Sequence, residues 1–378
     1  MLGLYIHIPF CEKICDYCDF FTIQGPNRLH GEYLDLLSRE ISAFSERHPG
    51  VLQQVETLYL GGGTPSILSP EALSRLFSIL GKAGVPLFSL QEATMEFNPE
   101  STDAERLSVA LSNGITRASL GLQRSRPELL LAVGRRHTPE SGLAALERLL
   151  SKPGLRVTAD LMFDLPGQTV SQFLEDLDSL SAYPLGHISF YGLKVDPRTR
   201  LGHRLEKGLV QVDEDLYGDM YREGVKLLKT RGFERYEVSN FARTGEESLH
   251  NLNYWRRGEY LALGPSANGF FGGVRFHAPD RYPEWRRYVE AGCPESLLAK
   301  DPIGHDEAVA ELIQLSLRTK YGLDVSALQD LGARFSEKSV SRWVERGFLQ
   351  WRGNHLVLDG DGWLFMDTVV ADIYSNLE

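Results

Sequence analysis

The sequence predicts an α/β protein, a partial barrel of six parallel strands with a separate module at its C-terminus. Through roughly the first 200 residues, six short segments with strand patterns alternate with segments of helical periodicity. Such alternation is typical of parallel βαβ units. Six strands are too few for a complete eight-stranded barrel, so we expect an open one whose functional side is formed by the loops after the strands.

The first strand shows the pattern most clearly. Leu4, Ile6 and Ile8 alternate with Tyr5 and His7, directly before a cluster of cysteines. The other five strands are expected at residues 55–60, 92–97, 115–122, 157–162 and 188–193. Between them, apolar residues recur at three- and four-residue steps, as at Leu34, Leu37, Ile41 and Phe44.

After about residue 205 the pattern changes. A long helix is expected over residues 212–232, followed by a glycine- and aromatic-rich section to about residue 276. The last part predicts helices at 305–317, 325–331 and 337–346, a hairpin of 347–350 with 355–358, and a final helix at 364–376. We therefore divide the chain into a partial barrel (1–205), an extension of the barrel (206–295) and a winged-helix-like module (296–378).

Composition limits the class of protein. The chain has 40 Lys and Arg against 51 Asp and Glu, a net charge of −11, which argues against a dedicated nucleic-acid surface. With 42% hydrophobic residues it can bury a large core. No uninterrupted apolar stretch long enough for a transmembrane helix and no secretory signal is evident, so we expect a cytoplasmic protein.

Three of the four cysteines form a C-x3-C-x2-C loop, Cys11, Cys15 and Cys18, at the end of the first strand. Three thiolates so close together suit one soft-metal centre. A structural zinc normally has four protein ligands, but Cys293 is remote and expected to be a lone thiol. His7 could complete a zinc site, although on a strand it would more simply line the barrel. A [4Fe–4S] cluster with one open iron fits three cysteines better.

This loop, with an aromatic residue before its last cysteine, resembles that of the radical S-adenosylmethionine (SAM) superfamily. The resemblance implies a [4Fe–4S] cluster held by the three cysteines and a SAM molecule bound to the open iron. In the family, one electron from the cluster cleaves SAM to give a 5′-deoxyadenosyl radical.

Later motifs resemble one branch of that superfamily, the oxygen-independent coproporphyrinogen III oxidases and the HemW-type haem chaperones. They are Tyr-Ile-His-Ile-Pro-Phe-Cys at 5–11, Gly-Gly-Gly-Thr-Pro at 61–65, Ser-Leu-Gly-Leu-Gln at 119–123 and Asp-Leu-Met-Phe-Asp-Leu-Pro-Gly-Gln at 160–168. The resemblance implies SAM contacts at Tyr5, Tyr17, Gly62, Gly63, Thr64, Glu96, Gln123, Arg135, Asp160 and Gly192. One departure is Asp164, where relatives usually have Gly.

Within the branch, two departures favour the chaperones. The first strand starts at residue 2, without the oxidases' N-terminal extension, and Phe20 stands where they carry a further cysteine. The segment His-Asn-Leu-Asn-Tyr-Trp at 250–255 resembles the chaperones' H-N-x-x-Y-W signature, which makes His250 a candidate axial haem ligand. Where relatives have a second His, this chain has Asn268, and His277 is a possible substitute. His137 and His187 we expect to be structural.

The resemblance thus implies a haem chaperone that binds haem, a [4Fe–4S] cluster and SAM. Expected partners are haem-accepting proteins such as respiratory cytochromes and an electron donor, with membrane contact only through a partner and no nucleic acid. One alternative is a coproporphyrinogen III oxidase-type enzyme of porphyrin metabolism. The other is a non-catalytic scaffold that holds a structural zinc. No catalytic residue is assigned.

Overall fold

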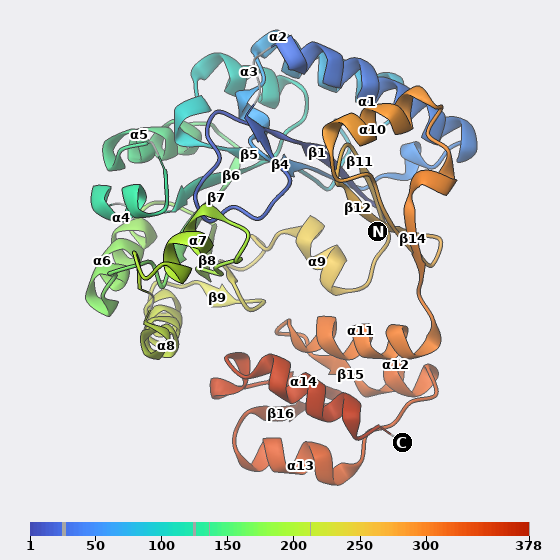
Figure 1. Cartoon of the computed structure of the whole chain (residues 1–378). Coiled ribbons are helices and arrows are strands. Elements are labelled where there is room, and N and C mark those ends of the chain that lie inside the picture. The colour runs from blue at the N-terminus through green and yellow to red at the C-terminus, as the bar shows by residue number, and fades with distance from the viewer. Residues whose placement is uncertain (25–27, 124–125, 136, 212, 378) are drawn as a thin grey trace.

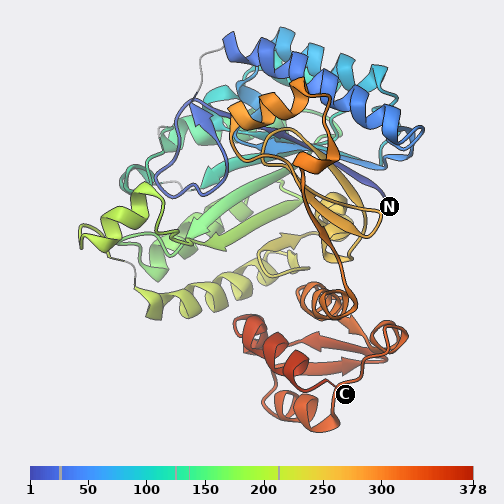
Figure 2. The same ribbon diagram turned by 45° about the vertical axis from the view of Figure 1, so that its right-hand side comes forward.

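The computed structural model describes residues 1–24, 28–123, 126–135, 137–211 and 213–377. Its centre is a large, mostly parallel sheet of twelve strands (Figures 1 and 2). Six parallel strands pair in chain order, as expected from the sequence. They are β1 (Gly3–Ile8), β4 (Thr57–Gly62), β5 (Glu92–Phe97), β6 (Arg117–Gln123), β7 (Arg156–Phe163) and β8 (His187–Gly192).

A seventh parallel strand, β11 (Tyr260–Leu263), lies on the other side of β1. We did not expect it, because its four residues are mostly buried instead of alternating between inside and outside. Antiparallel strands extend the sheet at both edges. They are β12 (Asn268–Phe271), β13 (Val274–His277) and β14 (Ala299–Pro302) beyond β11, and β10 (Asn240–Ala242) and β9 (Glu234–Arg235) beyond β8. The small pair β2 (Phe10–Cys11) and β3 (Ile23–Gln24) forms a separate ribbon.

Helices surround the sheet (Figure 1). The longer ones are α1 (Arg28–Arg47), α2 (Pro70–Lys82), α3 (Ala104–Ser112), α5 (Pro139–Leu150), α6 (Val170–Ser181), α8 (Glu214–Thr230) and α10 (Tyr282–Glu290); the shorter ones are α4 (Pro127–Ala132), α7 (Arg200–Glu206) and α9 (Leu249–Trp255). Ser69, Asp103, Thr138 and Thr169 cap the first turns of α2, α3, α5 and α6 through their side chains, so the sequence itself sets where these helices begin. Helix α8 corresponds to the long helix expected over 212–232 and is followed by Gly232 at φ 81°; Val212 lies outside the described residues.

The C-terminal part lies apart from the sheet in both views (Figures 1 and 2). It contains α11 (His305–Leu317), β15 (Leu323–Asp324), α12 (Val325–Asp330), α13 (Glu337–Glu345), β16 (Leu349–Arg352), β17 (His355–Leu358) and α14 (Met366–Ser375). The hairpin differs from the predicted one: β16 is shifted toward the turn, which consists of Gly353 and Asn354 alone. Gly353 adopts φ 61°, and a two-residue turn requires such a left-handed residue.

Asp164, at the position where the resemblance implies a glycine, lies just after β7 at φ 60°. Gly adopts this left-handed conformation without steric cost. Aspartate is one of the few other residues that tolerate it. The departure therefore leaves the local turn intact.

A buried glutamate fastens α1 to the neighbouring elements. Glu40 accepts hydrogen bonds from the Gly264 amide at 2.9 Å and from Trp285 Nε1 at 3.2 Å, so it joins α1 to the loop after β11 and to α10. The residue is only 3% exposed. Burial raises the pKa of its carboxyl from 4.5 to about 7, although both hydrogen bonds oppose the shift.

Glu40→Gln should therefore stabilise the protein at alkaline pH. A carboxyl with a raised pKa in the folded state contributes its full stability below pH 4.5, and this contribution is lost as the pH rises through about 7. The difference between the two pKa values corresponds to about 3 kcal/mol as an upper estimate. Urea unfolding midpoints at pH 5.5 and pH 8 measure the effect. We expect the unfolding midpoint of Glu40→Gln to exceed that of the wild type by more at pH 8 than at pH 5.5. Glu46→Gln changes an exposed residue of the same helix, and its effect on the midpoint should be the same at both pH values. A gain independent of pH would contradict the role of Glu40.

Candidate functional site

The three cysteines of the C-x3-C-x2-C loop line one pocket at the carboxyl end of the parallel strands. All three thiols are free and half-buried. The loop is docked by backbone hydrogen bonds on both sides of Asp16, whose amide donates to the Val133 carbonyl at 3.1 Å and whose carbonyl accepts from the Leu201 amide at 2.7 Å. Burial raises the pKa of the Cys11 thiol to about 11, so a thiolate here needs a nearby positive centre.

The surroundings fit a polynuclear centre better than a four-ligand zinc site. His7 has both ring nitrogens engaged, Nδ1 with the Tyr5 hydroxyl at 3.0 Å and Nε2 with the Phe21 carbonyl at 2.9 Å. Cys293 is buried beside α10, as the lone thiol that we expected. Within the described ranges, no three Cys, His, Asp or Glu side chains converge tightly enough to hold a single metal ion. The fit to an iron–sulfur cluster therefore depends on three free thiols that face one pocket.

The glycine loop packs directly on the cysteine segment. The Gly63 amide donates to the Ile8 carbonyl and the Thr64 amide to the Phe10 carbonyl, both at 2.8 Å. A Cβ on Gly63 would lie 2.6 Å from the Phe10 oxygen, and one on Gly62 would lie 2.6 Å from the His7 ring. Gly62 also adopts φ 107°. Any larger residue would push this loop away from the pocket, so a side chain at either position is excluded for steric reasons.

Two carboxyl groups line the pocket, from β5 and β7 on either side of β6. Glu96 accepts hydrogen bonds from the Tyr59 hydroxyl at 2.8 Å and from the Gly62 amide at 3.2 Å, and Asp160 accepts one from Ser119 at 3.1 Å. Burial, together with the nearby Asp160, raises the pKa of Glu96 to about 7. The pKa of Asp160 is raised by burial as well. The two groups thus carry less negative charge than exposed carboxylates would.

A hydrogen-bonded chain orders the basic side of the pocket. Arg135 donates from Nη2 to the Tyr17 hydroxyl at 3.0 Å and from Nη1 to Asn98 Oδ1 at 3.1 Å. Asn98 in turn donates to the Thr64 hydroxyl at 2.9 Å. Sequence analysis missed Asn98, although its place right after a strand was the available signal. The chain connects the cysteine loop, the glycine loop and Arg135 into one rigid wall.

Gln123 ends β6 at φ 64°, where the pairing with β7 shifts its register. Its side chain accepts a hydrogen bond from the Tyr191 hydroxyl at 2.9 Å, and Tyr191 is a further lining residue that we did not expect. A non-glycine residue in this conformation stores strain, which tertiary contacts must hold. Such strain is common at ligand sites.

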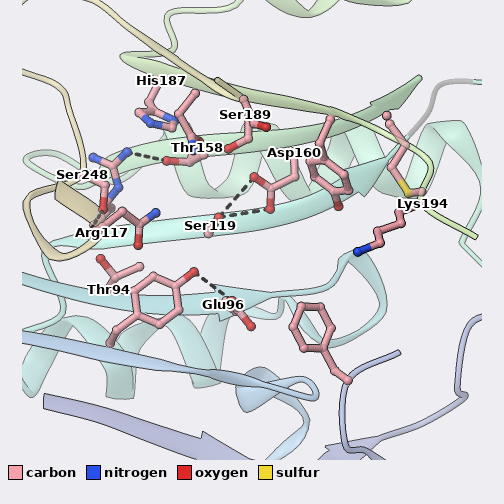
Figure 3. Close-up of a pocket in the computed structure, with 18 of the residues that line it drawn as sticks. Thr94, Glu96, Arg117, Ser119, Thr158, Asp160, His187, Ser189, Lys194 and Ser248 are labelled. Atoms are coloured by element: carbon pink, nitrogen blue, oxygen red, sulfur yellow. Dashed lines mark hydrogen bonds between the residues drawn. The ribbon is translucent and has the colours of Figure 1, made fainter. Parts of the chain in front are cut away.

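Eight of the predicted SAM contacts therefore line the same pocket of about 160 Å³ as the cysteines: Tyr17, Gly62, Gly63, Thr64, Glu96, Gln123, Arg135 and Asp160. A cavity of about 430 Å³ adjoins this pocket and shares Glu96 and Asp160 with it (Figure 3). Gly192 lines the larger cavity, where a Cβ would lie 2.3 Å from the Tyr217 ring. Tyr5 lines neither, and its hydroxyl contacts His7 instead.

His250 lies at the opposite end of the sheet, beside the first residue of β4. Its Nδ1 is 2.8 Å from the Thr57 hydroxyl and its Nε2 is 2.7 Å from the Tyr254 hydroxyl. The side chain is fully buried, and burial lowers its pKa to about 4, which keeps the ring neutral. Neutral imidazole is the form that ligates iron. In this conformation, however, both ring nitrogens have protein partners. The structure also does not bring His250 together with the cysteines, which lie at the other end of the parallel strands.

The structure does bring His277 next to Asn268. The two residues are paired across β12 and β13, and His277 Nδ1 lies 2.8 Å from Asn268 Oδ1. An imidazole is therefore present beside the position that relatives fill with His. His277 is partly exposed, and its Nε2 contacts Asp280 at 2.7 Å.

A buried carboxylate holds the helix that carries His250. Glu92, at the start of β5, accepts hydrogen bonds from the Leu249 and His250 amides, at 3.1 and 3.0 Å, at the N-terminus of α9. It also pairs with Arg156 at 2.9 Å and lies 3.9 Å from Arg117. Burial alone would raise the Glu92 pKa, but these arginines and amides outweigh it and lower the pKa. Glu92 is thus a charged cap for α9.

Comparison with known proteins agrees with this arrangement. A model of the radical SAM superfamily matches residues 5–180. The chain is 34% identical to "Heme chaperone HemW" of Mycobacterium tuberculosis (strain ATCC 25618 / H37Rv), over 98% of this chain and 94% of that protein. It is 37% identical to "Heme chaperone HemW" of Escherichia coli (strain K12), over 71% of this chain and 70% of that protein.

A solved structure has a similar fold. The structure described as "Coproporphyrinogen III oxidase (HemN) from Escherichia coli is a Radical SAM enzyme" superposes with a TM-score of 0.83, covering 99% of this chain and 90% of that one. The sequences are 20% identical, so the likeness concerns the fold alone. It confirms the α/β architecture with a large, mostly parallel sheet.

Glu92→Leu should destabilise the protein by about 3–5 kcal/mol, because the buried Arg117 and the half-buried Arg156 then lose their carboxylate and α9 loses its cap. Thermal unfolding measures the loss. Glu56→Leu is the control, since Glu56 is 41% exposed in its pair with the N-terminal amine and should cost about 1 kcal/mol or less. Equal losses in the two variants would contradict the role of Glu92.

Proposed function

The chain belongs to the HemW family within the radical SAM superfamily, and from this membership we propose that it is a haem chaperone, which binds haem and transfers it to acceptor proteins. The observation that carries the proposal is the 34% identity along 98% of the chain. This similarity extends well beyond the superfamily core at residues 5–180 and includes α9. The oxidase alternative is supported by the fold alone.

We propose Cys11, Cys15 and Cys18 as the ligands of a [4Fe–4S] cluster. Such a cluster leaves one iron open for SAM and supplies an electron to it. The remaining lining residues then orient SAM. Arg135, held by Tyr17 and Asn98, presents positive charge toward a carboxylate, and Glu96 presents a carboxyl group toward ribose hydroxyls. The aromatic rings of Tyr17 and Tyr191 exclude water from this end.

For haem we propose the α9 region, with His250 as the axial ligand. The neutral state of the ring and the aromatic side chains around it, Tyr59, Tyr254 and Tyr260, support this assignment. Binding requires that Nε2 leave the Tyr254 hydroxyl and that the ring become accessible. Haem binding at His250 would therefore be coupled to a movement of α9 or of its neighbours.

From the same family membership we also propose the organisation of the chain, its partners and its location. The six strands of the core form a partial (β/α)6 barrel, residues 206–295 extend it, and residues 296–378 form a winged-helix-like module. Haem acceptors such as respiratory cytochromes and an electron donor are the proposed partners, and the cytoplasm is the proposed location. No helix among the described residues is long and apolar enough to cross a membrane.

Cys15→Ala should remove most of the iron and the visible cluster absorbance after anaerobic reconstitution, because two thiolates do not hold the cluster securely. SAM affinity should fall with it. Iron and sulfide analysis together with equilibrium dialysis of SAM measure both effects. Cys293→Ala, which removes the buried lone thiol, should keep the full iron content. A complete cluster in Cys15→Ala would refute the ligand set.

A haem titration of the reconstituted protein, followed in the Soret region, tests the chaperone proposal and the ligand together. We expect saturation near one haem per chain, loss of that signal in His250→Ala, and unchanged iron content of the cluster in the variant. Tyr254→Phe should strengthen haem binding, since it frees Nε2.

His277→Ala is the control for a histidine on β13, next to the edge strand of the sheet. An unchanged haem spectrum in His250→Ala, with a changed one in His277→Ala, would move the ligand to His277. No saturable binding in the wild type would reject the chaperone function.

A further inference from the structure

The larger cavity has an unusually polar wall. In a β/α barrel, the positions that face inward are normally filled by branched apolar side chains. Here the inward positions of β5 to β8 carry small or polar residues, among them Thr94, Ser119, Thr158, His187 and Ser189. They leave a cavity of about 430 Å³, beginning at the candidate SAM pocket and continuing between the strands toward α9. Thr94, Arg117, His187 and Ser248 line the end of this cavity away from Lys194 (Figure 3). We call these four residues the cavity floor.

Two atoms of the cavity floor are buried without a hydrogen-bond partner, Thr94 Oγ1 and His187 Nδ1. Their residues are only 1% and 2% exposed. An unsatisfied buried polar atom costs stability, so a protein retains few of them without a reason. Sequence analysis expected His187 to be structural, which accounts for one ring nitrogen only.

The free nitrogen of His187 can act as a donor. Its Nε2 lies 2.8 Å from the Tyr236 hydroxyl, which also accepts a hydrogen bond from the Ser248 amide. In the tautomer in which the hydroxyl donates to Nε2, the proton of the neutral ring lies on Nδ1 and is available to a ligand. Burial, together with Arg117 and Arg156, keeps the His187 pKa well below its usual value, so the ring stays neutral.

The floor also carries excess positive charge. Two arginines, Arg117 and Arg156, share the single carboxylate of Glu92. Arg117 is 2% exposed and is held in place by hydrogen bonds to Thr158 Oγ1 at 2.8 Å and to the Glu246 carbonyl at 3.1 Å. The cavity has three carboxyl groups, Asp19, Glu96 and Asp160. Glu96 and Asp160 also line the candidate SAM pocket, and Asp19 directly follows Cys18 in the cysteine loop, so none of the three is on the floor. A ligand with an anionic end is therefore oriented with that end on the floor.

We propose that the cavity floor is a carboxylate-binding site, in which Thr94 and His187 donate hydrogen bonds to the carboxylate and Arg117 supplies the compensating charge. The volume, part of which lies beside the candidate SAM pocket, fits a short-chain carboxylic acid or one carboxylate arm of a larger ligand such as haem. Either source presents the same group to the floor. Binding of a short-chain acid at this site does not depend on the proposed haem chaperone function. Binding of a carboxylate arm of haem does depend on it.

The first experiment uses propionate on the full-length protein reconstituted with its cluster. Propionamide, a neutral molecule of the same shape, and sodium chloride at equal ionic strength are the controls. We expect propionate alone to raise the thermal unfolding midpoint in a saturable way. Thr94→Val should bind propionate about tenfold more weakly, since one hydrogen bond to a charged group is lost. It should not destabilise the free protein, because the hydroxyl has no partner to lose.

Two control variants sharpen this result. Thr319→Val removes a buried hydroxyl that is bonded to the Ser316 carbonyl and does not line the cavity, and it should leave propionate binding unchanged. Lys194→Met tests the other cation of the cavity wall. If Lys194→Met abolished propionate binding and Thr94→Val did not affect it, the carboxylate would bind at Lys194 and the proposal would be overturned.

The second arm distinguishes the two sources by comparing haem with its dimethyl ester. If a propionate arm of haem occupies the floor, Thr94→Val weakens haem binding about tenfold and leaves binding of the ester unchanged. If a small free acid is the ligand, Thr94→Val changes propionate binding only. The absence of a saturable propionate effect, together with equal binding of haem and its ester to both proteins, would overturn the proposal. Failure of the chaperone function shows separately, as loss of all haem binding while the propionate effect persists.

Discussion

Buried charge at the start of the central strands is the constraint on which much of the structure depends. Glu92 is fully buried, and a lone carboxylate in such a place would be strongly unfavourable. It is tolerated because two arginines from β6 and β7 and the N-terminus of α9 surround it. These partners come from segments far apart in the chain, so the ion pair can form only when the strands have assembled. It fixes where α9 lies, and with it the whole H-N-x-x-Y-W segment.

The opposite end of the sheet is organised by hydrogen bonds and close backbone packing, without an ion pair among the described contacts that join the three loops. The glycine loop and the cysteine segment share backbone hydrogen bonds, and the absence of side chains at Gly62 and Gly63 allows this approach. Asn98 then joins the glycine loop to Arg135, which reaches Tyr17 in the cysteine loop. The geometry of the pocket is thus set before any cofactor binds. Such preorganisation lowers the entropic cost of binding.

Between the two ends lies a cavity that a purely structural protein would fill. An apolar side chain at Thr94 would add burial and remove an unpaired polar atom, so this part of the polar wall lowers stability. A fold that retains this cost at its centre has a use for the space. The cavity also separates the cysteine loop from His250, which places the candidate SAM site and the candidate haem ligand at different ends of one sheet. Any coupling between them has to pass through the strands or through the ligand in the cavity.

The sequence by itself determined the elements and the cofactor end of the site. Alternation along each strand, capping residues such as Ser69 and Thr169, and the cysteine spacing are local signals, readable within a few residues. Because parallel strands present their carboxyl ends at one edge, even the grouping of Glu96, Gln123 and Asp160 followed from their order. Tertiary structure decided what depends on contacts across the chain: the position of β11 beside β1, the burial of His250 between Thr57 and Tyr254, and the unpaired atoms of the cavity floor. No local pattern encodes these features, since whether a polar atom has a partner is known only when every distant neighbour is in place.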